Sequence, residues 1–491
     1  MIFSGPARRL AVAGFAAMSC LAGCAVNPAT HRPQLVLTTQ AQEREAGHET
    51  AEQIETSIGT IRDEKLATYV AEIGSRVAAE TPESDFVYEF RVLDVAEPNA
   101  FALPGGYVFV TRGMLALTSS EDELAAVLAH EVGHVAARHS SNQLSLQAPM
   151  RIVTGIGALA TTIVSPTLGD AVADAGGAAA DAVFAPFSRQ QEGEADQLAQ
   201  EFTSAAGWDP AGMSWALASL QRHAEREGGS GDDEGGFLSS HPATPERVED
   251  TRERASELAA ASSTSRTSDR RAFLAHLDGL IVGPDPRHGV FVGTKFVHPE
   301  LAFSVRFPEG WRTANGLRTV GARSRDGSSV VTVTIAGEGD DPMAVARTFA
   351  DGADGALALE KRPVGDLSAV RGVAHGESPD GESELDLAWI AYRGLVFQIT
   401  AVSPITPSGV ERAEVMRAVE SFHALTPGER PPLHADRLRI ATAREGETVI
   451  DVARRSGSLW DPRDTAVLND VEPNVPLVEG TPVKVVLRER Y

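Results

Sequence analysis

The chain has 491 residues, 42% of them hydrophobic, which is enough for about three domains with ordinary cores. Its formal net charge of −24 at pH 7 disfavours nucleic acid and anionic membrane surfaces as partners, and its sequence holds no nucleic-acid-binding motif. The only two cysteines, Cys20 and Cys24, lie in the N-terminal targeting segment described below. The rest of the chain must therefore be stabilised by packing rather than by disulfides.

Residues 1–23 are predicted to be a signal peptide. Two arginines form a short positive region, residues 10–22 are apolar but short for a membrane span, and Leu-Ala-Gly-Cys ends the segment at Cys24. This ending resembles a bacterial lipoprotein box, which implies that Cys24 is the lipidated first residue of the mature chain. An ordinary cleaved signal or a retained anchor is the alternative. The resemblance implies a place in the cell envelope, on the periplasmic side of a bacterial membrane, and Ala25 favours the outer membrane.

The next segments are short predicted elements. The composition of residues 25–40 indicates a polar tether, and residues 41–80 are predicted to form one or two helices. Residues 86–95 alternate like a strand, and residues 107–111, after a Pro-Gly-Gly turn, are also strand-like. An edge strand near a catalytic metal can bind a substrate backbone by strand addition, and we predict this role for residues 101–109. An internal hairpin is the alternative.

The chemistry centres on a helix predicted to begin at Ser120. Glu123 completes a capping box with Ser120, and apolar residues follow at helical spacing. His130 and His134 lie four residues apart and point the same way, so that their imidazoles can share one zinc ion. Glu131, about 100° around the helix, can take a proton from water at the metal. A pair of structural histidines is the alternative, although HExxH should arise by chance in such a chain only on the order of a few per cent of the time.

A hydrolytic zinc site usually takes three protein ligands and leaves a fourth position for water. The third ligand is expected from the segment Ser188 to Asp196, which is predicted to be helical from Gln190 onward. Glu192 and Asp196 lie one turn apart, so Glu192 can bind zinc while Asp196 accepts a hydrogen bond from the far nitrogen of a ligand histidine. Glu194 points about 200° away and is expected to be solvated. A favourable helix dipole is the ordinary explanation for an acidic helix start.

Four motifs, in the same order, resemble the gluzincin metallopeptidases of the bacterial BepA and HtpX type over roughly residues 40–260. They are HExxH, the Ser-Arg-x-x-Glu-x-Glu-Ala-Asp sequence, the segment Asn99–Leu115, and the segment Phe237–Arg247 with its His-Pro pair. The resemblance implies an α+β fold, with a mainly helical protease domain and a small sheet over residues 41–270, one zinc ion, and protein or peptide substrates. It assigns Glu131 as general base and three zinc ligands: His130, His134 and Glu192.

Three further residues and one long segment are candidates for roles near the site. The resemblance implies that His241 can occupy the fourth zinc position and keep the enzyme latent, whereas a lone loop histidine is usually a surface residue. Arg247 can stabilise the oxyanion or hold a helix by a salt bridge, and the sequence does not choose. His139 is not at ligand spacing from His134, so it is expected to support the site or be structural. Residues 152–185 are expected to form a mobile lid or interfacial surface, or else a buried helical hairpin.

Two smaller units are predicted after the protease domain. Residues 285–425 are predicted to be a small α+β domain, one sheet with helices on a face. It holds no catalytic cluster, and the isolated His298 and His375 are expected to have surface or structural roles. A binding or positioning role is expected for the domain as a whole. Residues 432–491 resemble a LysM module, a βααβ unit that binds N-acetylglucosamine glycans such as peptidoglycan. The matched positions mainly specify packing, so they predict the fold more directly than glycan binding.

Together these features predict a lipid-anchored, zinc-dependent endopeptidase of the bacterial cell envelope. By resemblance, its substrates are misfolded or misassembled envelope proteins. The alternative is a non-catalytic or latent zinc-containing chaperone or peptidoglycan-attached scaffold, in which His241 permanently fills the last zinc position. A zinc-dependent glycan amidase is a further alternative, although its ligand spacing usually differs from HExxH followed by glutamate.

Overall fold

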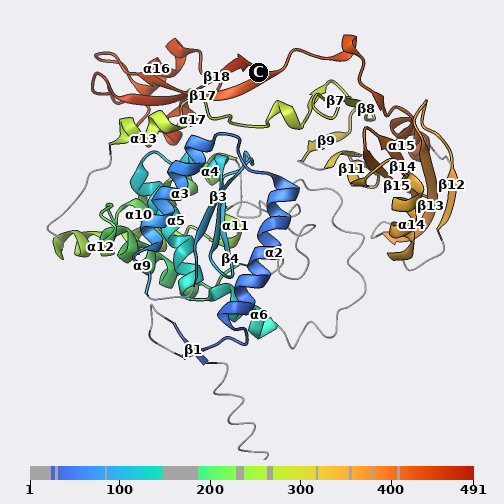
Figure 1. The fold of residues 1–491 in the computed structure, drawn as a ribbon. Helices are drawn as coiled ribbons and strands as arrows, with labels where there is room; N and C mark the ends of the chain where they lie inside the picture. Colours follow the sequence, from blue (N-terminus) through green and yellow to red (C-terminus); the bar gives the residue numbers. More distant parts are fainter. Residues whose placement is uncertain are drawn as a thin grey trace, which may run out of the picture. The chain divides into compact units, whose positions relative to one another are not determined.

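The computed structural model describes the chain in several stretches (Figure 1), which are residues 24–27, 31, 33–82, 86–147, 186–227, 237–261, 269–316, 319–352, 357–378, 381–405 and 410–491. The described residues form two compact units. The first unit runs to Gly283 and also includes Asp436–Arg488, whereas the second comprises Pro284–Ala435 and Glu489–Tyr491. The predicted signal peptide and the predicted lid over residues 152–185 lie outside the described residues. None of the helices within these stretches is long and apolar enough to cross a membrane.

The N-terminal segment does not have the form of the polar tether predicted for residues 25–40. Strand β1 (Cys24–Val26) pairs antiparallel with β2 (Pro33–Leu35). The Gln34 side chain donates a hydrogen bond of 2.7 Å to the carbonyl of Ala137. Backbone pairing and this contact give the segment partners within the first unit, which composition alone could not indicate.

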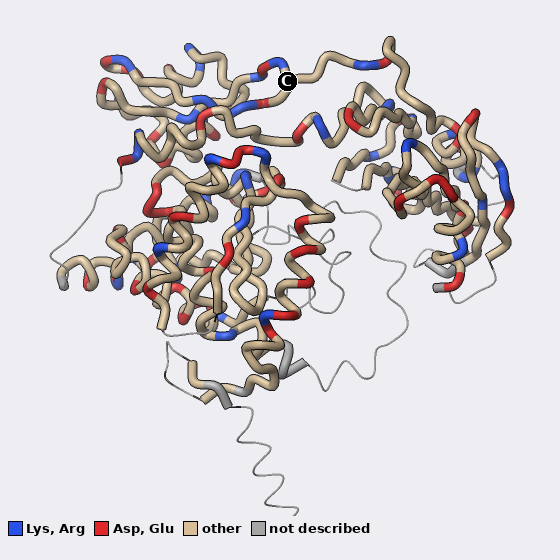
Figure 2. Tube along the Cα trace, in the orientation of Figure 1, with Lys and Arg blue, Asp and Glu red and all other residues tan. Residues whose placement is uncertain are grey.

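Two helices follow, each with a polar start. Helix α2 (Gln40–Ile58) begins at Thr39, which forms a capping box with Gln42, and α3 (Glu64–Ala78) is capped by Asp63. Buried residues recur along both helices at helical spacing, while acidic residues lie along α2 (Figure 2). The prediction of one or two helices over residues 41–80 is thus resolved as two.

A three-stranded sheet follows, formed by β3 (Glu89–Leu93), β4 (Ala100–Leu103) and β5 (Tyr107–Thr111) in the order β3-β5-β4. Strand β5 runs parallel to β3 and antiparallel to β4. Only β4 is therefore an edge strand within the predicted substrate segment 101–109. Residues 107–109 lie in the central strand, where both backbone edges are already paired, so the prediction was wrong for that half.

Helices form most of the first unit (Figure 1). After β5 they are α4 (Arg112–Leu117), α5 (Glu121–Ala136), α6 (His139–Gln147), α9 (Arg189–Ala205), α10 (Gly212–Glu227), α11 (Phe237–Ser240), α12 (Pro245–Ala261) and α13 (Arg270–Leu277). Helix α5 packs against α9, α10, α3 and β4. A Cβ atom at Gly133 would lie 3.1 Å from the carbonyl oxygen of Ala195, so glycine permits the close approach of α5 and α9. This approach brings the two predicted metal-binding motifs together.

The second unit contains two sheets, whereas the sequence predicted one. The larger sheet has the order β12-β13-β14-β15-β11-β10-β9, and the smaller has the order β16-β8-β7-β6. Buried phenylalanines from both sheets and from the segment after α15 form its core, including Phe296, Phe303, Phe397 and Phe422. The sequence does not indicate that the short strands form a separate smaller sheet, because strand pairing is non-local.

The elements of this unit have the following bounds: η2 (Pro286–His288), β6 (Val290–Val292), β7 (Lys295–His298), β8 (Phe303–Arg306), β9 (Arg312–Asn315), β10 (Thr319–Arg323), β11 (Val330–Glu338), α14 (Pro342–Gly352), β12 (Ala358–Lys361), β13 (Ala369–Ser378), β14 (Gly381–Tyr392), β15 (Leu395–Pro404), α15 (Val410–Glu420), β16 (His423–Ala424) and η3 (Pro427–Glu429). Helix α15 packs against β15, and α14 packs against β13 and β14. The unit is thus mixed α+β, as predicted.

The C-terminal segment has the predicted βααβ order, with β17 (His434–Thr442), α16 (Val449–Ser456), α17 (Pro462–Leu468) and β18 (Pro482–Arg490). Strands β17 and β18 form a two-stranded sheet. Most of this segment groups with the first unit, where α17 packs against α10. It is therefore a part of the unit that carries the metal-binding motifs, although the sequence predicts a separate module.

Candidate metal centre

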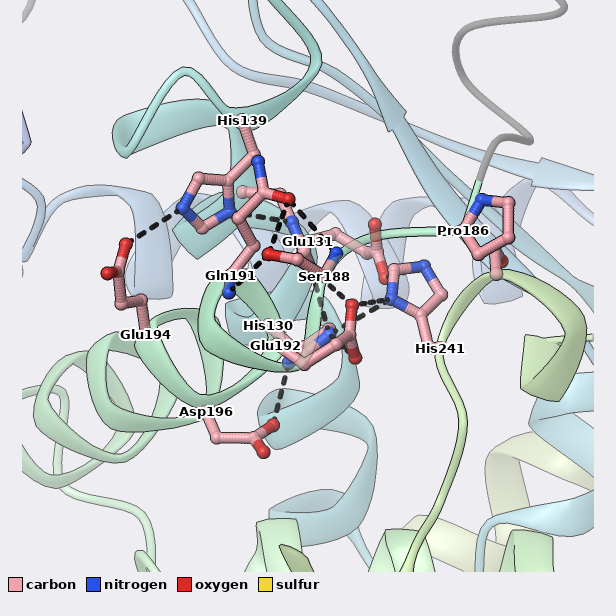
Figure 3. Close-up of polar contacts among 12 residues, drawn as sticks. His130, Glu131, His139, Pro186, Ser188, Gln191, Glu192, Glu194, Asp196 and His241 are labelled. Carbon is pink, nitrogen blue, oxygen red and sulfur yellow. Dashed lines mark hydrogen bonds and ion pairs between the residues drawn. The ribbon is translucent and has the colours of Figure 1, made fainter. Parts of the chain in front are cut away.

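Four buried side chains from three parts of the first unit converge at one point (Figure 3). His130 and His134 come from α5, Glu192 comes from the first turn of α9, and His241 directly follows α11. Each offers one ligand atom, and these four atoms lie within 4.8 Å of one another. The side chains are at most 2% exposed. The structure thus brings together all four residues that the sequence analysis names as zinc ligands or fourth-position candidate.

The distances within this cluster fit a tetrahedral metal site. His130 Nε2 lies 3.0 Å from His134 Nε2 and 3.2 Å from His241 Nδ1. Glu192 Oε1 lies 2.9 Å from His241 Nδ1 and 3.4 Å from His134 Nε2. Nitrogen and oxygen ligands of tetrahedral zinc, each about 2.0–2.2 Å from the ion, are separated by about 3.3 Å. The observed separations scatter around that value.

The protonation of His130 shows that the cluster requires a positive charge. Its Nδ1 lies 3.0 Å from Asp196 Oδ1, and a carboxylate accepts but does not donate, so that Nδ1 keeps a proton and Nε2 is the nitrogen that can bind a metal once its own proton has left. Burial lowers the pKa of His130, but Asp196 and Glu192 outweigh it and raise that pKa to about 9. Burial holds the pKa of His134 well below its usual value. Two facing Nε2 lone pairs repel each other unless a cation binds both, so the donor set suits zinc.

Arg247 fixes the two carboxylates behind the cluster. Its Nε and Nη2 each donate a hydrogen bond of 2.8 Å to Asp196, and its Nη1 lies 2.7 Å from Glu192 Oε2. The same Nη1 donates to the carbonyl of Pro242, the residue after His241. These contacts favour the salt-bridge role among the two that the sequence left open. One guanidinium thereby orients Glu192, Asp196 and the loop that carries His241.

Glu131 lies beside the cluster without belonging to it. Its side chain is buried, and its Oε1 lies 3.7 Å from His241 Nε2. Burial raises the pKa of Glu131, although the positive charges of His241 and His130 oppose this. A raised pKa makes the carboxylate a stronger proton acceptor, which is the property a general base needs.

Glu194 differs from the prediction that it is solvated. It is buried, and its Oε2 lies 3.2 Å from His139 Nε2. The chain turns at Arg138, whose φ is 56°, and α6 then begins with His139 beside the zinc-binding helix. The angle per residue of a helix correctly predicted that Glu194 and Glu192 point in different directions. It could not show that another segment, starting at His139, covers that face.

Aromatic rings close the site around the histidines. Phe187 stacks on His134 with ring centroids 4.0 Å apart, and Phe237 stacks on His241 at 4.5 Å. The backbone places His241 through a hydrogen bond of 2.9 Å from its N–H to the carbonyl of Phe237. The sequence analysis gave neither phenylalanine a role: Phe187 directly precedes the motif that begins at Ser188, and Phe237 is the first residue of the segment Phe237–Arg247.

The site contains two histidines one helical turn apart, a glutamate from a second helix and a buried carboxylate beside them. This combination is typical of a zinc metallopeptidase. Residues 62–255 match the model of Peptidase family M48. This match covers the part of the chain that carries the four clustered residues, and it supports a metalloprotease that uses zinc. The family resemblance predicted from the sequence is thereby confirmed.

Several curated proteins are similar to this domain. The mitochondrial metalloendopeptidase OMA1 of Schizosaccharomyces pombe is 35% identical over 180 residues, which are 37% of this chain and 50% of that protein. The beta-barrel assembly-enhancing protease of Escherichia coli is 28% identical over 220 residues, 44% of each chain. The putative beta-barrel assembly-enhancing protease of Vibrio cholerae is 32% identical over 201 residues, 40% of each chain. The chain thus spans half or less of the length of these relatives.

Two solved structures are each similar to less than a third of the chain. The cyanobacterial PsbP protein of Synechocystis has 13% identity and a TM-score of 0.23, covering 28% of this chain and 95% of that chain. The Ran-binding protein Mog1p of Saccharomyces cerevisiae has 10% identity and a TM-score of 0.21, covering 29% of this chain and 100% of that chain.

The affinity for zinc should rise with pH between 7 and 9. The pKa of His130 is about 9, so below that value a proton must leave Nε2 before the metal binds. One released proton corresponds to roughly a tenfold gain in apparent affinity per pH unit in this window. Competition with a chromophoric chelator from pH 6.5 to 8.5 measures the slope, and His298→Gln in the second unit serves as control. A flat profile would contradict the assigned protonation.

Proposed function

We propose that this chain is a zinc-dependent endopeptidase of the bacterial cell envelope, lipid-anchored through Cys24, that degrades misfolded or misassembled envelope proteins. The convergence of His130, His134 and Glu192, with Glu131 beside them, carries the proposal. The names of the beta-barrel assembly-enhancing proteases support the envelope location and the class of substrate. The lipoprotein-like ending at Cys24 supports the anchor and the outer membrane.

The proposed roles of the residues follow from their positions. His130, His134 and Glu192 would hold zinc, which when bound supplies a Lewis acid for the scissile carbonyl and for water. Glu131 accepts the proton of the water that attacks the carbonyl carbon. As the C–N bond breaks, Glu131 passes this proton to the leaving nitrogen and returns to its ionised form. One water is consumed, and a carboxylic acid and an amine are produced.

Strand β4 is the proposed binding site for the substrate backbone. It is the edge of the three-stranded sheet, and it packs against α5, the helix that carries the two histidines. An extended peptide added along this edge would present its scissile bond to residues of the same helix. The proposal concerns Ala100–Leu103 alone, because Tyr107–Thr111 is central in the sheet.

His241 is proposed to act as a latch. Its Nδ1 completes the four-atom cluster, in the position that a hydrolytic site leaves for water. Release of His241 would open that position. The same closed arrangement favours the alternative function, a latent zinc-containing chaperone or a scaffold attached to peptidoglycan, in which His241 never leaves.

The C-terminal βααβ segment is proposed to hold the enzyme near the cell wall by binding N-acetylglucosamine glycans. The order of β17, α16, α17 and β18 supports this proposal together with the sequence resemblance to LysM modules. Protein substrates and peptidoglycan would then be the two partners of the chain, with the lipid at Cys24 as its membrane contact.

The test is casein cleavage by the full chain purified in detergent, as wild type and as His241→Ala, with zinc content measured in both. We expect the wild type to cleave casein, a chelator to abolish cleavage, and added zinc to restore it. His241→Ala should cleave faster, because the fourth position is then free for water. His375→Ala, an exposed histidine of the second unit, is the control and should match the wild type.

Two results would decide against the proposal. Full zinc occupancy without cleavage in either form would favour the latent chaperone or scaffold. Release of peptidoglycan fragments without casein cleavage would instead favour a glycan amidase. If His241→Ala cleaves casein no faster than the wild type, the proposed protease activity is retained and the proposed latch role of His241 is wrong.

A further inference from the structure

We propose that His139 and Glu194 hold the ligand His134 in its metal-binding tautomer, and that Asn27 connects this pair to the N-terminal segment. The inference deepens the proposed function and rests on the metal centre described above. It concerns positioning residues, since neither His139 nor Glu194 belongs to the four-residue cluster.

The contacts form an unbroken line toward the metal centre (Figure 3). His139 Nδ1 lies 2.9 Å from His134 Nδ1, and His139 Nε2 lies 3.2 Å from Glu194 Oε2. His134, His139 and Glu194 are 2%, 1% and 6% exposed. Water therefore has little access to compete for these polar atoms, and their mutual contacts decide where the protons lie.

The carboxylate determines the direction of both hydrogen bonds. An ionised Glu194 only accepts, so one ring proton of His139 lies on Nε2, and Nδ1 is the nitrogen left to accept. That lone pair requires a donor, and the atom facing it is Nδ1 of His134. With its proton on Nδ1, His134 keeps the Nε2 lone pair that faces His130 and Glu192. Glu194 thus selects the tautomer of a ligand that it does not touch.

The two ligand histidines are supported differently. His130 Nδ1 lies next to a carboxylate directly, that of Asp196, at 3.0 Å. For His134 the carboxylate is that of Glu194, and the imidazole of His139 lies between the two and contacts both. Partners of metal ligands fix ring orientation and raise ligand basicity. The His139–Glu194 pair is the counterpart, on His134, of Asp196 on His130.

Asn27 extends this line to the N-terminal segment. Its Nδ2 donates to Glu194 Oε2 at 2.6 Å, and Gln190 Nε2 donates to Oε1 at 2.7 Å. Asn27 is 5% exposed and lies three residues after Cys24, the proposed lipidation site. A shift of the N-terminal segment would remove one of the donors that orient Glu194.

Two further contacts join the same segment to the end of α5. Gln34 donates to the carbonyl of Ala137, and Arg138 Nη2 donates to the carbonyl of Thr38 at 2.6 Å. The N-terminal segment therefore contacts the zinc-binding helix where that helix ends, and also the carboxylate that supports His134. A displacement of this segment would therefore act on the metal centre through these contacts.

The test measures metal binding by the full chain purified in detergent, in Glu194→Gln, His139→Phe and Asn27→Ala. Zinc affinity is measured by competition with a chelator, and the absorption spectrum is recorded at saturating Co²⁺. We expect zinc affinity to fall about 10- to 100-fold in Glu194→Gln and His139→Phe. Asn27→Ala should show a smaller loss, because the carboxylate remains. The cobalt bands should shift in the first two variants, since the basicity of a ligand changes.

Glu201→Gln is the matched control, on the same helix and with the same chemical change. Its partner is Arg254, and its half-exposed side chain lies away from the cluster. We expect wild-type affinity and an unchanged cobalt spectrum. A purely structural loss would lower the unfolding temperature of Glu194→Gln without shifting the bands at saturation, and that result would overturn the tautomer role.

The remaining outcomes separate the inference from the proposed function. A wild-type chain that binds no zinc would overturn both. A wild type that binds zinc, with unchanged affinity and spectrum in Glu194→Gln and His139→Phe, would overturn only the inference. If Asn27→Ala alone keeps wild-type affinity, the link to the N-terminal segment is wrong. Should Glu194→Gln fail to fold, Glu194→Asp must retain zinc and the cobalt bands better than His139→Phe for the inference to stand.

Discussion

Replacing Glu131 with glutamine should slow casein cleavage by about 10²- to 10⁴-fold, the usual contribution of a general acid–base group. The amide keeps the shape of the side chain but cannot take a proton from water. Zinc content should stay at the wild-type level, because Glu131 is not among the four clustered ligand residues. Initial cleavage rates and metal analysis of the same samples measure both quantities.

Glu121→Gln provides a matched control at the first residue of α5. Glu121 accepts hydrogen bonds from Tyr69 and Trp208 and has no contact with the cluster. We expect its variant to keep the wild-type rate. Undiminished cleavage by Glu131→Gln would remove Glu131 from the mechanism. Joint loss of zinc and activity would instead make Glu131 a ligand.

The metal centre was the part of this protein most accessible from the sequence. A spacing of four residues puts His130 and His134 on one face of any helix. Ser120 marks the start of that helix, because its side chain accepts a hydrogen bond from the Glu123 N–H. Glu192 and Asp196 follow the same rule on α9. Local geometry fixes which side chains share a helix face, whereas the meeting of α5 and α9 is a tertiary contact, which the sequence indicated only through the family resemblance.

Residue spacing alone could not place the side chains that contacts between distant segments bring to the site. His241 reaches the cluster because Phe237, at the start of α11, donates its N–H to the carbonyl of Pro98. His139 covers Glu194 only because the chain turns at Arg138. The edge position of β4, rather than β5, follows from pairing with β3, a strand that the sequence predicts but does not order within the sheet.

The same limit explains the C-terminal segment. The alternation around Lys484 correctly indicates a strand, but a lysine between valines also reads as a solvent-facing residue. Lys484 is instead 0% exposed. Its Nζ donates to the carbonyls of Ala116, Leu117 and Thr118, at the end of α4 and just before the zinc-binding helix. A pattern of residue types cannot show that a strand contacts a segment 366 residues away.

Replacing Lys484 with methionine should destabilise the first unit by about 3 kcal/mol, because three buried carbonyls lose their donor and the buried carboxylate of Glu123 loses a nearby cation. For a unit of this size the loss corresponds to a fall in Tm of roughly 5–10 °C.

Burial lowers the pKa of Lys484 to about 7, whereas an unfolded lysine titrates near 10.5. Between pH 7 and 10.5 the folded amine is therefore mostly neutral while the unfolded one is charged, so that the wild-type free energy of unfolding rises with pH in this window. The deficit of Lys484→Met should accordingly be larger at pH 9 than at pH 7.

Arg488→Met is the matched control on the same strand. Arg488 pairs with Asp436 at the surface, where screening by solvent leaves an ion pair with little effect on stability. Its Tm should stay near that of the wild type, as measured by calorimetry at both pH values. If Lys484→Met unfolds at the wild-type temperature, the C-terminal segment does not support the start of the zinc-binding helix. A loss of Tm accompanied by weaker zinc binding would show that this support reaches the metal centre, because α5 begins three residues after Thr118.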